Sequence, residues 1–155
     1  MLDLIIFEVE KRSLSVLAAE VIEIVRVVAV TELVGCEAPF VGVINYRGTV
    51  VPVARLNLDT NLRLLDHMLI MGQDSYASMC LVVDRVLAFT TADEVLALTD
   101  VNKGGFQSLK LTPELARVGN TLVPLLKLEV LLAQTPDLPL SLPMQETPAS
   151  AFNAS

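Results

Sequence analysis

Short apolar runs, separated by turn residues at intervals of about 8 to 12 residues, repeat along most of this chain. This spacing predicts an all-β sandwich or barrel. Hydrophobic residues make up 53% and charged residues 19% of the 155 positions, so a disordered scaffold is excluded for most of the length. We therefore expect a folded all-β body.

The distribution of charge excludes several classes of partner. Charge-free stretches such as residues 38–46 stop at nine residues, well short of the ~18 to 20 that a membrane span needs. A net charge of -7 repels phosphate backbones. The first residues, MLDLIIFE, lack the basic region of a secretion signal. We expect a soluble cytoplasmic protein with no nucleic-acid partner and no direct membrane insertion.

The cysteines agree with that location. Cys36 and Cys80 are the only two, and their spacing does not resemble a metal site. Two buried thiols in a reducing compartment fit this pattern. The sequence therefore gives no reason to expect a disulfide framework.

Residues 40–53, which read FVGVINYRGTVVPV, predict a β-hairpin. Two strands, 41–46 and 49–53, are joined by a tight turn in which Gly48 can adopt positive φ without a steric cost. Gly42 lacks a side chain at a point where another backbone or a partner can approach closely. Pro52 cannot donate to a strand ladder, which predicts an edge or a bulge there.

The other expected elements are a hairpin turn at residues 10–13, a helical turn and strand across 18–28, strands at 67–71 and 79–86 joined through 73–75, a strand at 122–126 and a short helix at 128–133. Thr91 and Glu94 have the spacing of a capping box, which predicts another short helix through Leu98.

A coarse duplication of strand, turn and strand suggests two small barrels in one domain over residues 1–134, with the chain changing lobes near residues 55–67. Residues 135–155 hold half of the prolines and lack periodicity, so we expect a disordered Pro-rich tail.

Catalytic chemistry is poorly supported. His67 is the only histidine, and at the head of an apolar run a hydrogen-bonded structural histidine is the favoured interpretation. Asp93 and Glu94 are more simply a solvated face than metal ligands, and the glycine pair at 104–105 lacks P-loop spacing. We expect no enzyme, no metal and no cofactor, and a module whose function lies in surfaces that bind other proteins.

Residues 42–53, GVINYRGTVVPV, resemble the pattern GVxNLRGxVxPVxDL of the CheW-like family, the adaptor domain that couples chemoreceptors to the histidine kinase CheA. Three further matches follow the family order: VIEI at 21–24, LVVDRV at 81–86 and LLKLEVLL at 125–132. The resemblance covers about residues 2–134.

The resemblance implies two SH3-like five-stranded β-barrel lobes with short helices, in one CheW-like domain. It also implies a non-catalytic adaptor that couples chemoreceptors, the methyl-accepting proteins, to a CheA-type histidine kinase. In the family, a groove between the lobes holds the receptor tip, and lobe surfaces contact the kinase regulatory domain. The expected location is the cytoplasm, with recruitment to membrane-associated receptor arrays.

The motifs carry over eight candidate receptor- or kinase-binding residues, namely Val21, Glu23, Gly42, Asn45, Arg47, Gly48, Val86 and Phe89. Arg47 is either aimed at a partner carboxylate or carbonyl, or pins its own turn, and both can hold. We favour a partner contact for Glu23 and backbone geometry for Gly42 and Gly48. For Phe89, core burial is favoured over an exposed anchor.

The chain departs from the family pattern at several positions. Arg55 and Lys127 replace usual acids, and Tyr46 replaces the usual leucine. Residues 112–115 stand where a glycine-containing strand is expected. These changes suggest as an alternative a diverged scaffold in a pilus-motility or surface-sensing pathway.

A further alternative is a small-molecule-sensing β-barrel module, suggested by aliphatic residues and by Met68, Met71 and Met79. Two small barrels have more surface per residue than one larger domain, so they cannot bury all of these apolar side chains. We therefore also expect at least one apolar surface patch, which an adaptor that joins two partners requires.

Overall fold

The protein is described by a computed structural model that covers residues 2–33, 40–56, 67–97 and 114–133. Its strands are β1 (Leu2–Val9), β2 (Arg12–Leu17), β3 (Val21–Arg26), β4 (Thr31–Glu32), β5 (Phe40–Tyr46), β6 (Thr49–Arg55), β7 (His67–Gln73), β8 (Tyr76–Val83), β9 (Arg85–Ala92), β10 (Glu94–Ala97), β11 (Glu114–Val118) and β12 (Thr121–Leu126). The helical pieces are the 3-10 turn η1 (Ala18–Glu20) and the helix α1 (Leu128–Leu132). The expected all-β fold with short helices is confirmed.

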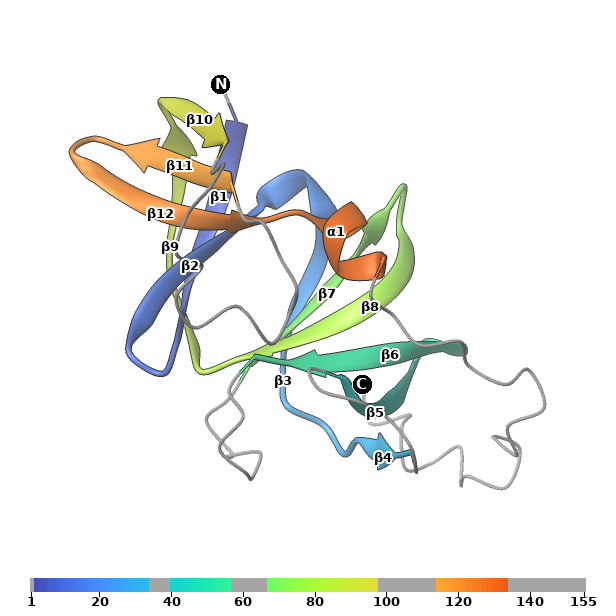
Figure 1. Ribbon diagram of the computed structural model, residues 1–155. Helices are drawn as coiled ribbons and strands as arrows, with labels where there is room; N and C mark the ends of the chain where they lie inside the picture. Colours follow the sequence, from blue (N-terminus) through green and yellow to red (C-terminus); the bar gives the residue numbers. More distant parts are fainter. Residues whose placement is uncertain (1, 34–39, 57–66, 98–113, 134–155) are drawn as a thin grey trace.

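The strands form two sheets, which Figure 1 shows as two lobes with α1 between them. Lobe A has the order β10-β11-β12-β2-β1-β9, and lobe B has the order β3-β7-β8-β6-β5-β4. In each sheet the two outermost strands are successive pieces of the chain, since only Asp93 separates β9 from β10 and only residues 27–30 separate β3 from β4. When each such pair is taken as one bent strand, each lobe has five strands, as the SH3-like prediction requires.

The predicted change of lobe near residues 55–67 is wrong. Strands β6 and β7, on either side of that range, belong to the same lobe B sheet. The chain enters lobe B through η1 and returns to lobe A at Asp84, between β8 and β9. Lobe A is completed by the parallel pairing of β12 with β2, which a pattern of local runs does not reveal. The predicted tail at 135–155 lies outside the described residues.

The tight turns follow the sequence closely. Three hairpins have positive φ at both central residues, the geometry that matches the twist of antiparallel strands; the pairs are Glu10–Lys11, Arg47–Gly48 and Asp74–Ser75. The turns predicted at 10–13, 47–48 and 73–75 are therefore confirmed. The helical turn followed by a strand across 18–28 is also present, as η1 and β3.

The short helix predicted from Thr91 and Glu94 is wrong. These residues lie in β9 and β10, and the Thr91 hydroxyl donates to the Asp3 carboxylate at 3.0 Å instead of capping a helix. Pairing of β9 with β1 and of β10 with β11 supplies the backbone hydrogen bonds that a local helix would otherwise make. The predicted helix at 128–133 is present as α1.

Three apolar clusters form the core. The seam cluster lies between the lobes and is built from Ile5, Phe7, Val9, Leu14, Val16, Phe40, Ala54, Leu69, Met71, Met79, Leu81, Val83, Leu126, Leu128 and Leu131. The lobe B cluster consists of Ile44, Tyr46, Val51, Val53, Met68, Ile70, Cys80 and Val82. The lobe A cluster consists of Leu4, Ala92, Ala116 and Leu125. Both lobes and α1 share the seam cluster, so the lobes are packed as one unit.

The described residues include one of the two cysteines and bear on whether the chain has a helix that could span a membrane. Cys80 is fully buried, as expected, and burial raises the pKa of its thiol far above the ordinary value. Cys36 lies outside the described residues. Within them, no helix has both the length and the apolar character needed to cross a bilayer.

Candidate functional site

Asn45 and Gly48 build the turn that presents Arg47. Gly48 has φ +87° and Arg47 has φ +50°, and the Gly48 amide donates to Asn45 Oδ1 at 2.7 Å. The amide side chain therefore closes the turn from within, a common role of asparagine in turns. Asn45 and Gly48 shape the backbone, while the Arg47 side chain is left at the surface with 67% of its area exposed.

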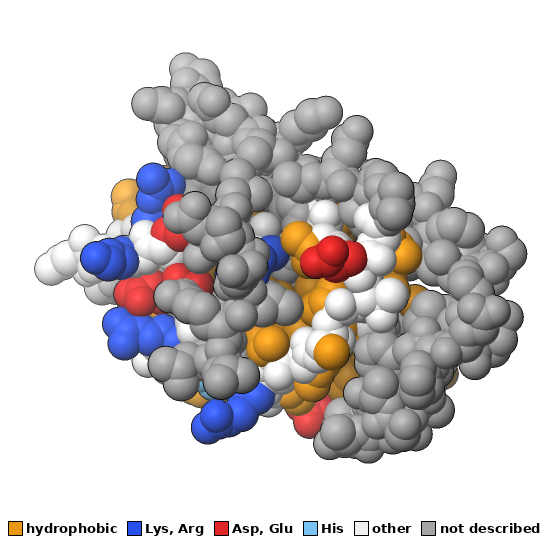
Figure 2. Space-filling view, turned by 90° about the horizontal axis from the view of Figure 1, so that it is seen from below, with side chains coloured by type: hydrophobic (Ala, Val, Ile, Leu, Met, Phe, Trp, Pro, Cys, Tyr) orange, Lys and Arg blue, Asp and Glu red, His pale blue; other side chains and the backbone are white. Residues whose placement is uncertain are grey.

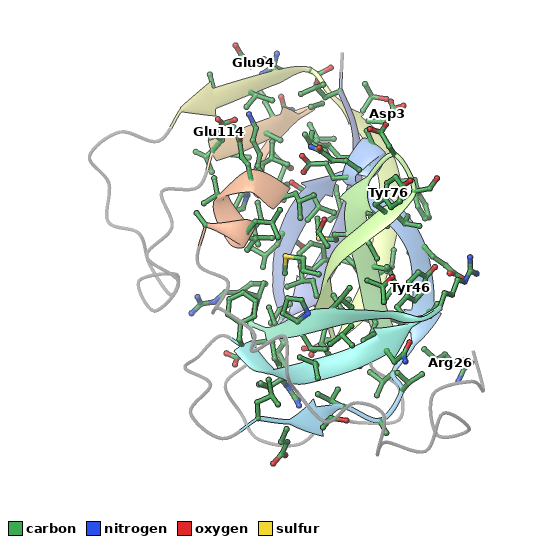
Figure 3. All side chains as sticks on the ribbon, turned by 90° about the vertical axis from the view of Figure 1, so that its right-hand side faces the viewer. Asp3, Arg26, Tyr46, Tyr76, Glu94 and Glu114 are labelled. Atoms are coloured by element: carbon green, nitrogen blue, oxygen red, sulfur yellow. The ribbon has the colours of Figure 1, made fainter. Side chains whose placement is uncertain are left out.

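Glu23, Tyr46 and Arg47 meet beside this turn, and we call them the Tyr46 cluster. The Tyr46 hydroxyl donates to Glu23 Oε1, and Arg47 Nη2 donates to the same oxygen at 3.1 Å. The Arg47 Cζ lies 5.1 Å from the centre of the Tyr46 ring, within the range of a cation–π contact. Figure 3 shows Tyr46 near the tip of the β5–β6 hairpin, far from Glu94 and Glu114 at the other end of the molecule.

The protonation state of Tyr46 suits this arrangement. The pKa of the phenol is raised, first by burial and then by its hydrogen bond to Glu23 and by the negative charge of that carboxylate, while Arg47 acts in the opposite direction. At neutral pH the hydroxyl is therefore protonated and can donate to Glu23.

Gly42 lies near the start of β5, where β4 pairs with it in antiparallel fashion. A Cβ at this position would lie 2.2 Å from the Thr31 carbonyl oxygen, a distance that no side chain can tolerate. The close approach predicted for Gly42 is therefore made by the backbone of β4, and Gly42 is separate from the Tyr46 cluster. For Gly42 and Gly48 alike, backbone geometry explains the glycine.

Val21 and Val86 belong to different lobes, on β3 and β9. Both are partly buried and pack against the seam cluster. Phe89 lies opposite Ile5, a member of that cluster, but is 68% exposed. Its predicted core burial is wrong, because β9 forms the edge of the lobe A sheet, where a side chain has fewer neighbours. We call Val21, Val86 and Phe89 the seam rim.

The candidate residues thus occupy separate places. Val21 pairs with Met71 of the seam cluster, whereas Glu23 pairs with Ile70 of the lobe B cluster. An irregularity in register between Val21 and Glu23 accounts for this change of face. Two neighbouring candidates of β3 therefore serve two different surfaces, the seam rim and the Tyr46 cluster.

The surface is not uniformly polar. The exposed large apolar side chains, besides Phe89, are Leu2, Tyr76, Leu87, Leu96, Leu122 and Leu132. Figure 2 shows apolar side chains gathered around an acidic one on the face seen from below. This agrees with the expectation that two small barrels leave apolar surface uncovered.

Two carboxylates that were not predicted as site residues accept hydrogen bonds from backbone amides that are distant in the sequence. Asp84 Oδ2 accepts the Glu10 amide at 2.8 Å, and the Asp84 amide donates to the Glu8 carbonyl at 2.9 Å. Glu20 Oε1 accepts the Leu128 amide at 2.9 Å, at the start of α1. Asp84 lies between β8 and β9, so the strand predicted over 79–86 ends before this residue. Glu20 carries no local signal, because its partner lies 108 residues away.

The departures from the family pattern have structural counterparts. Lys127 Nζ forms an ion pair with Glu114 Oε2 at 3.1 Å, so the cation that replaces an acid finds its partner in a strand that itself departs from the pattern. Arg55 is buried, with 5% of its surface exposed. Tyr46 uses its hydroxyl in the cluster described above.

His67 begins β7 and is partly buried. Its Nδ1 is buried and makes no hydrogen bond within the described residues, so the prediction of a hydrogen-bonded structural histidine is not confirmed. Over the same residues, no three His, Cys, Asp or Glu side chains gather in an arrangement that could hold a metal ion.

The fold and the site define a two-lobed β-barrel module whose candidate residues lie on an exposed turn and on the rim of a seam between lobes. The family model of the CheW-like domain matches residues 3–136. The chain therefore belongs to the CheW-like domain family, and membership supports a coupling or scaffolding role in chemotaxis.

Solved structures show the same fold. A crystal structure of the scaffolding protein TtCheW from Thermoanaerobacter tengcongensis is similar to this chain with a TM-score of 0.67. The two sequences are 19% identical, and the similarity covers 82% of this chain and 89% of the other. No curated protein sequence matches the chain.

Proposed function

We propose that this protein is a non-catalytic adaptor that couples chemoreceptors to a CheA-type histidine kinase. The observation that carries the proposal is the match of the CheW-like family model over nearly the whole two-lobed body, residues 3–136. The similar fold of TtCheW, itself described as a scaffolding protein, agrees with this role. The protein would act in the cytoplasm and be recruited to membrane-associated receptor arrays.

Two surfaces are available for partners, and they differ in chemistry. The seam rim offers apolar contacts from both lobes through Val21, Val86 and the exposed ring of Phe89. The Tyr46 cluster offers a cation and an anion side by side, with 67% of the Arg47 side chain and 37% of the Glu23 side chain exposed. An adaptor that joins two partners needs two such surfaces, and exposed aromatic and arginine side chains are frequent anchors at interfaces.

Arg47 satisfies both interpretations of its role. It pins its own hairpin to β3 through Glu23, and it keeps most of its surface accessible. A guanidinium has five N–H donors in a fixed fork, so one ion pair leaves donors for a partner carboxylate or carbonyl.

The alternative functions receive less support. Met68, Met71 and Met79, which suggested a ligand-sensing module, are fully buried in the seam and lobe B clusters and therefore fill the core. Lys127, one of the departures from the family pattern, forms its ion pair with Glu114 of the same chain. This departure therefore does not require a different binding partner.

Binding of both partners tests the proposal. The purified chain is mixed with the regulatory domain of a CheA-type kinase and with a chemoreceptor cytoplasmic tip fragment, both from the same organism, and complexes are measured by pull-down and calorimetry. We expect binding to each and a ternary complex with both. A folded sample that binds neither partner contradicts the proposal.

A further inference from the structure

We propose that Tyr46 is a positioning residue that fixes the Glu23–Arg47 ion pair in the orientation that meets a partner. This inference rests on the proposed function, because it assigns a role within one of the two proposed contact surfaces. It concerns a residue at which the chain departs from the leucine of the family pattern, and which sequence reasoning treated only as a departure.

Burial of the Tyr46 ring fixes the place of its hydroxyl. Tyr46 is 8% exposed and belongs to the lobe B cluster, where it packs with residues such as Ile44 and Met68. A tyrosine has only two side-chain torsions, so a packed ring leaves its oxygen little freedom. The hydroxyl therefore holds Glu23 Oε1 at a defined point of the surface.

The same ring restrains Arg47. The guanidinium carbon lies 5.1 Å from the ring centre, and Nη2 donates at 3.1 Å to the oxygen that Tyr46 also binds. Each of the three residues therefore contacts the other two. An exposed ion pair without such support gains little, because two long side chains lose conformational freedom to form it. Leucine at position 46 would offer neither a hydroxyl nor a π face.

The arrangement leaves defined atoms for a partner. Both hydrogen bonds converge on Glu23 Oε1. Within the described part of the chain, Glu23 Oε2 and the Nε and Nη1 atoms of Arg47 make no hydrogen bond. One acceptor and a set of donors, held side by side, match a peptide or carboxamide group, which has one N–H and one carbonyl. We therefore infer that the partner presents an exposed amide here.

The test uses the two tyrosines of the chain as a matched pair. Tyr46→Phe keeps the buried ring and removes only the hydroxyl. Tyr76→Phe is the control, because Tyr76 is the only other tyrosine and is 78% exposed. Two quantities are measured on the full chain: the order parameter of the Arg47 Nε–Hε bond by ¹⁵N relaxation, and the affinity for the kinase regulatory domain and for the receptor tip.

We expect Tyr46→Phe to lower the Arg47 order parameter to below about 0.6 and to weaken binding of one partner about tenfold, as expected for loss of a hydrogen bond to a charged group. Tyr76→Phe should change neither quantity. An Arg47 side chain that is as ordered in Tyr46→Phe as in the wild type overturns the inference, as does an unchanged affinity.

A double variant separates positioning from a merely structural effect. If Tyr46 acts through Glu23, then adding Tyr46→Phe to Glu23→Ala causes no further loss of affinity. Independent losses that multiply would overturn the inference. Glu23→Ala alone, at a partly exposed position, should also release Arg47, which keeps the test decisive if Tyr46→Phe folds poorly. A wild-type chain that binds neither partner would refute the proposed function, while the relaxation measurement would still decide the role of Tyr46.

Discussion

Two arginines, Arg47 and Arg117, occupy similar positions in the two lobes but differ in what surrounds them. Arg47 lies within the lobe B hairpin turn that contains Gly48, and Arg117 lies two residues before Gly119 of a lobe A hairpin turn; both glycines have positive φ. Each is paired with an acid of another strand at about the same distance, 3.1 Å for Arg47 to Glu23 and 3.0 Å for Arg117 to Glu94. An ion pair by itself therefore does not separate a binding residue from a structural one.

The difference lies in how many local contacts each guanidinium makes. Arg117 also lies 3.6 Å from Asp93 and donates to the Gly119 carbonyl at 3.2 Å, and the Gly119 amide donates to Asp93 at 2.8 Å. These contacts tie the β11–β12 turn to the bend between β9 and β10. Arg117 is 41% exposed, against 67% for Arg47.

The comparison suggests a criterion for the candidate site. A guanidinium whose donors are used within its own turn stabilises that turn, while one that is held in place but keeps donors exposed can serve a partner. By this criterion we propose Arg47 as a binding residue and Arg117 as a structural one. The following predictions test that distinction.

The largest expected effect is on binding. Arg47→Ala should weaken binding of one partner at least about tenfold, since the proposed contact arginine is lost, and should change the free energy of unfolding by less than about 0.5 kcal/mol. Isothermal titration calorimetry and thermal unfolding measure the two quantities. A large fall in melting temperature without a loss of affinity would reverse the assignment.

Arg117→Ala should show the opposite pattern. Loss of the network with Asp93 and Glu94 should lower the free energy of unfolding by about 1 kcal/mol, which corresponds to a fall of several degrees in melting temperature. Affinity for both partners should stay within the error of the measurement. Weaker binding at unchanged stability would mean that this end of lobe A is also a contact surface.

Gly48→Ala and Gly119→Ala compare the two turns themselves. Each glycine has positive φ and open space around a Cβ position, so alanine should cost about 1 kcal/mol of stability in either turn through backbone strain alone. Chemical denaturation measures both variants. Only Gly48→Ala should also reduce affinity, because its turn presents Arg47; equal affinities would show that the shape of this turn does not matter for binding.

The smallest effect is a dependence of stability on pH. Because the pKa of Tyr46 is raised above 10.0 in the folded state, its contribution to stability is complete below that value and is lost as the pH rises through the folded-state pKa. The gap in melting temperature between the wild type and Tyr46→Phe should therefore stay constant up to about pH 9 and narrow only as the pH rises above about 10. Tyr76→Phe should run parallel to the wild type, and a constant gap between wild type and Tyr46→Phe would contradict this account.

Local features of the fold were predictable from the sequence. The turn at Arg47 and Gly48, the strand after η1 and the short helix α1 depend on residues close to one another in the chain, so turn chemistry and apolar periodicity indicate them. The lobe boundary and the strand at Glu94 were missed, because both depend on pairing between distant strands, such as β12 with β2.

The residues of the candidate site that lie in one local turn were predictable from the sequence, and those joined by long-range contacts were not. The motif at 42–53 identified Asn45, Arg47 and Gly48, and the structure places them in one turn. The contact of Tyr46 with Glu23 spans 23 residues and two strands that are not neighbours in the sheet. Nothing in the spacing of the two residues indicates it. The exposure of Phe89 was missed for a related reason, since an edge strand is recognised only once the sheet order is known.

The most direct test of the central claim is calorimetry of the wild type, Arg47→Ala and Arg117→Ala against the same two partners, the kinase regulatory domain and the receptor tip. The account predicts that the wild type and Arg117→Ala bind both partners with equal affinity and that Arg47→Ala binds one of them at least about tenfold more weakly. Equal affinity of all three proteins, or no binding by the folded wild type, would contradict it.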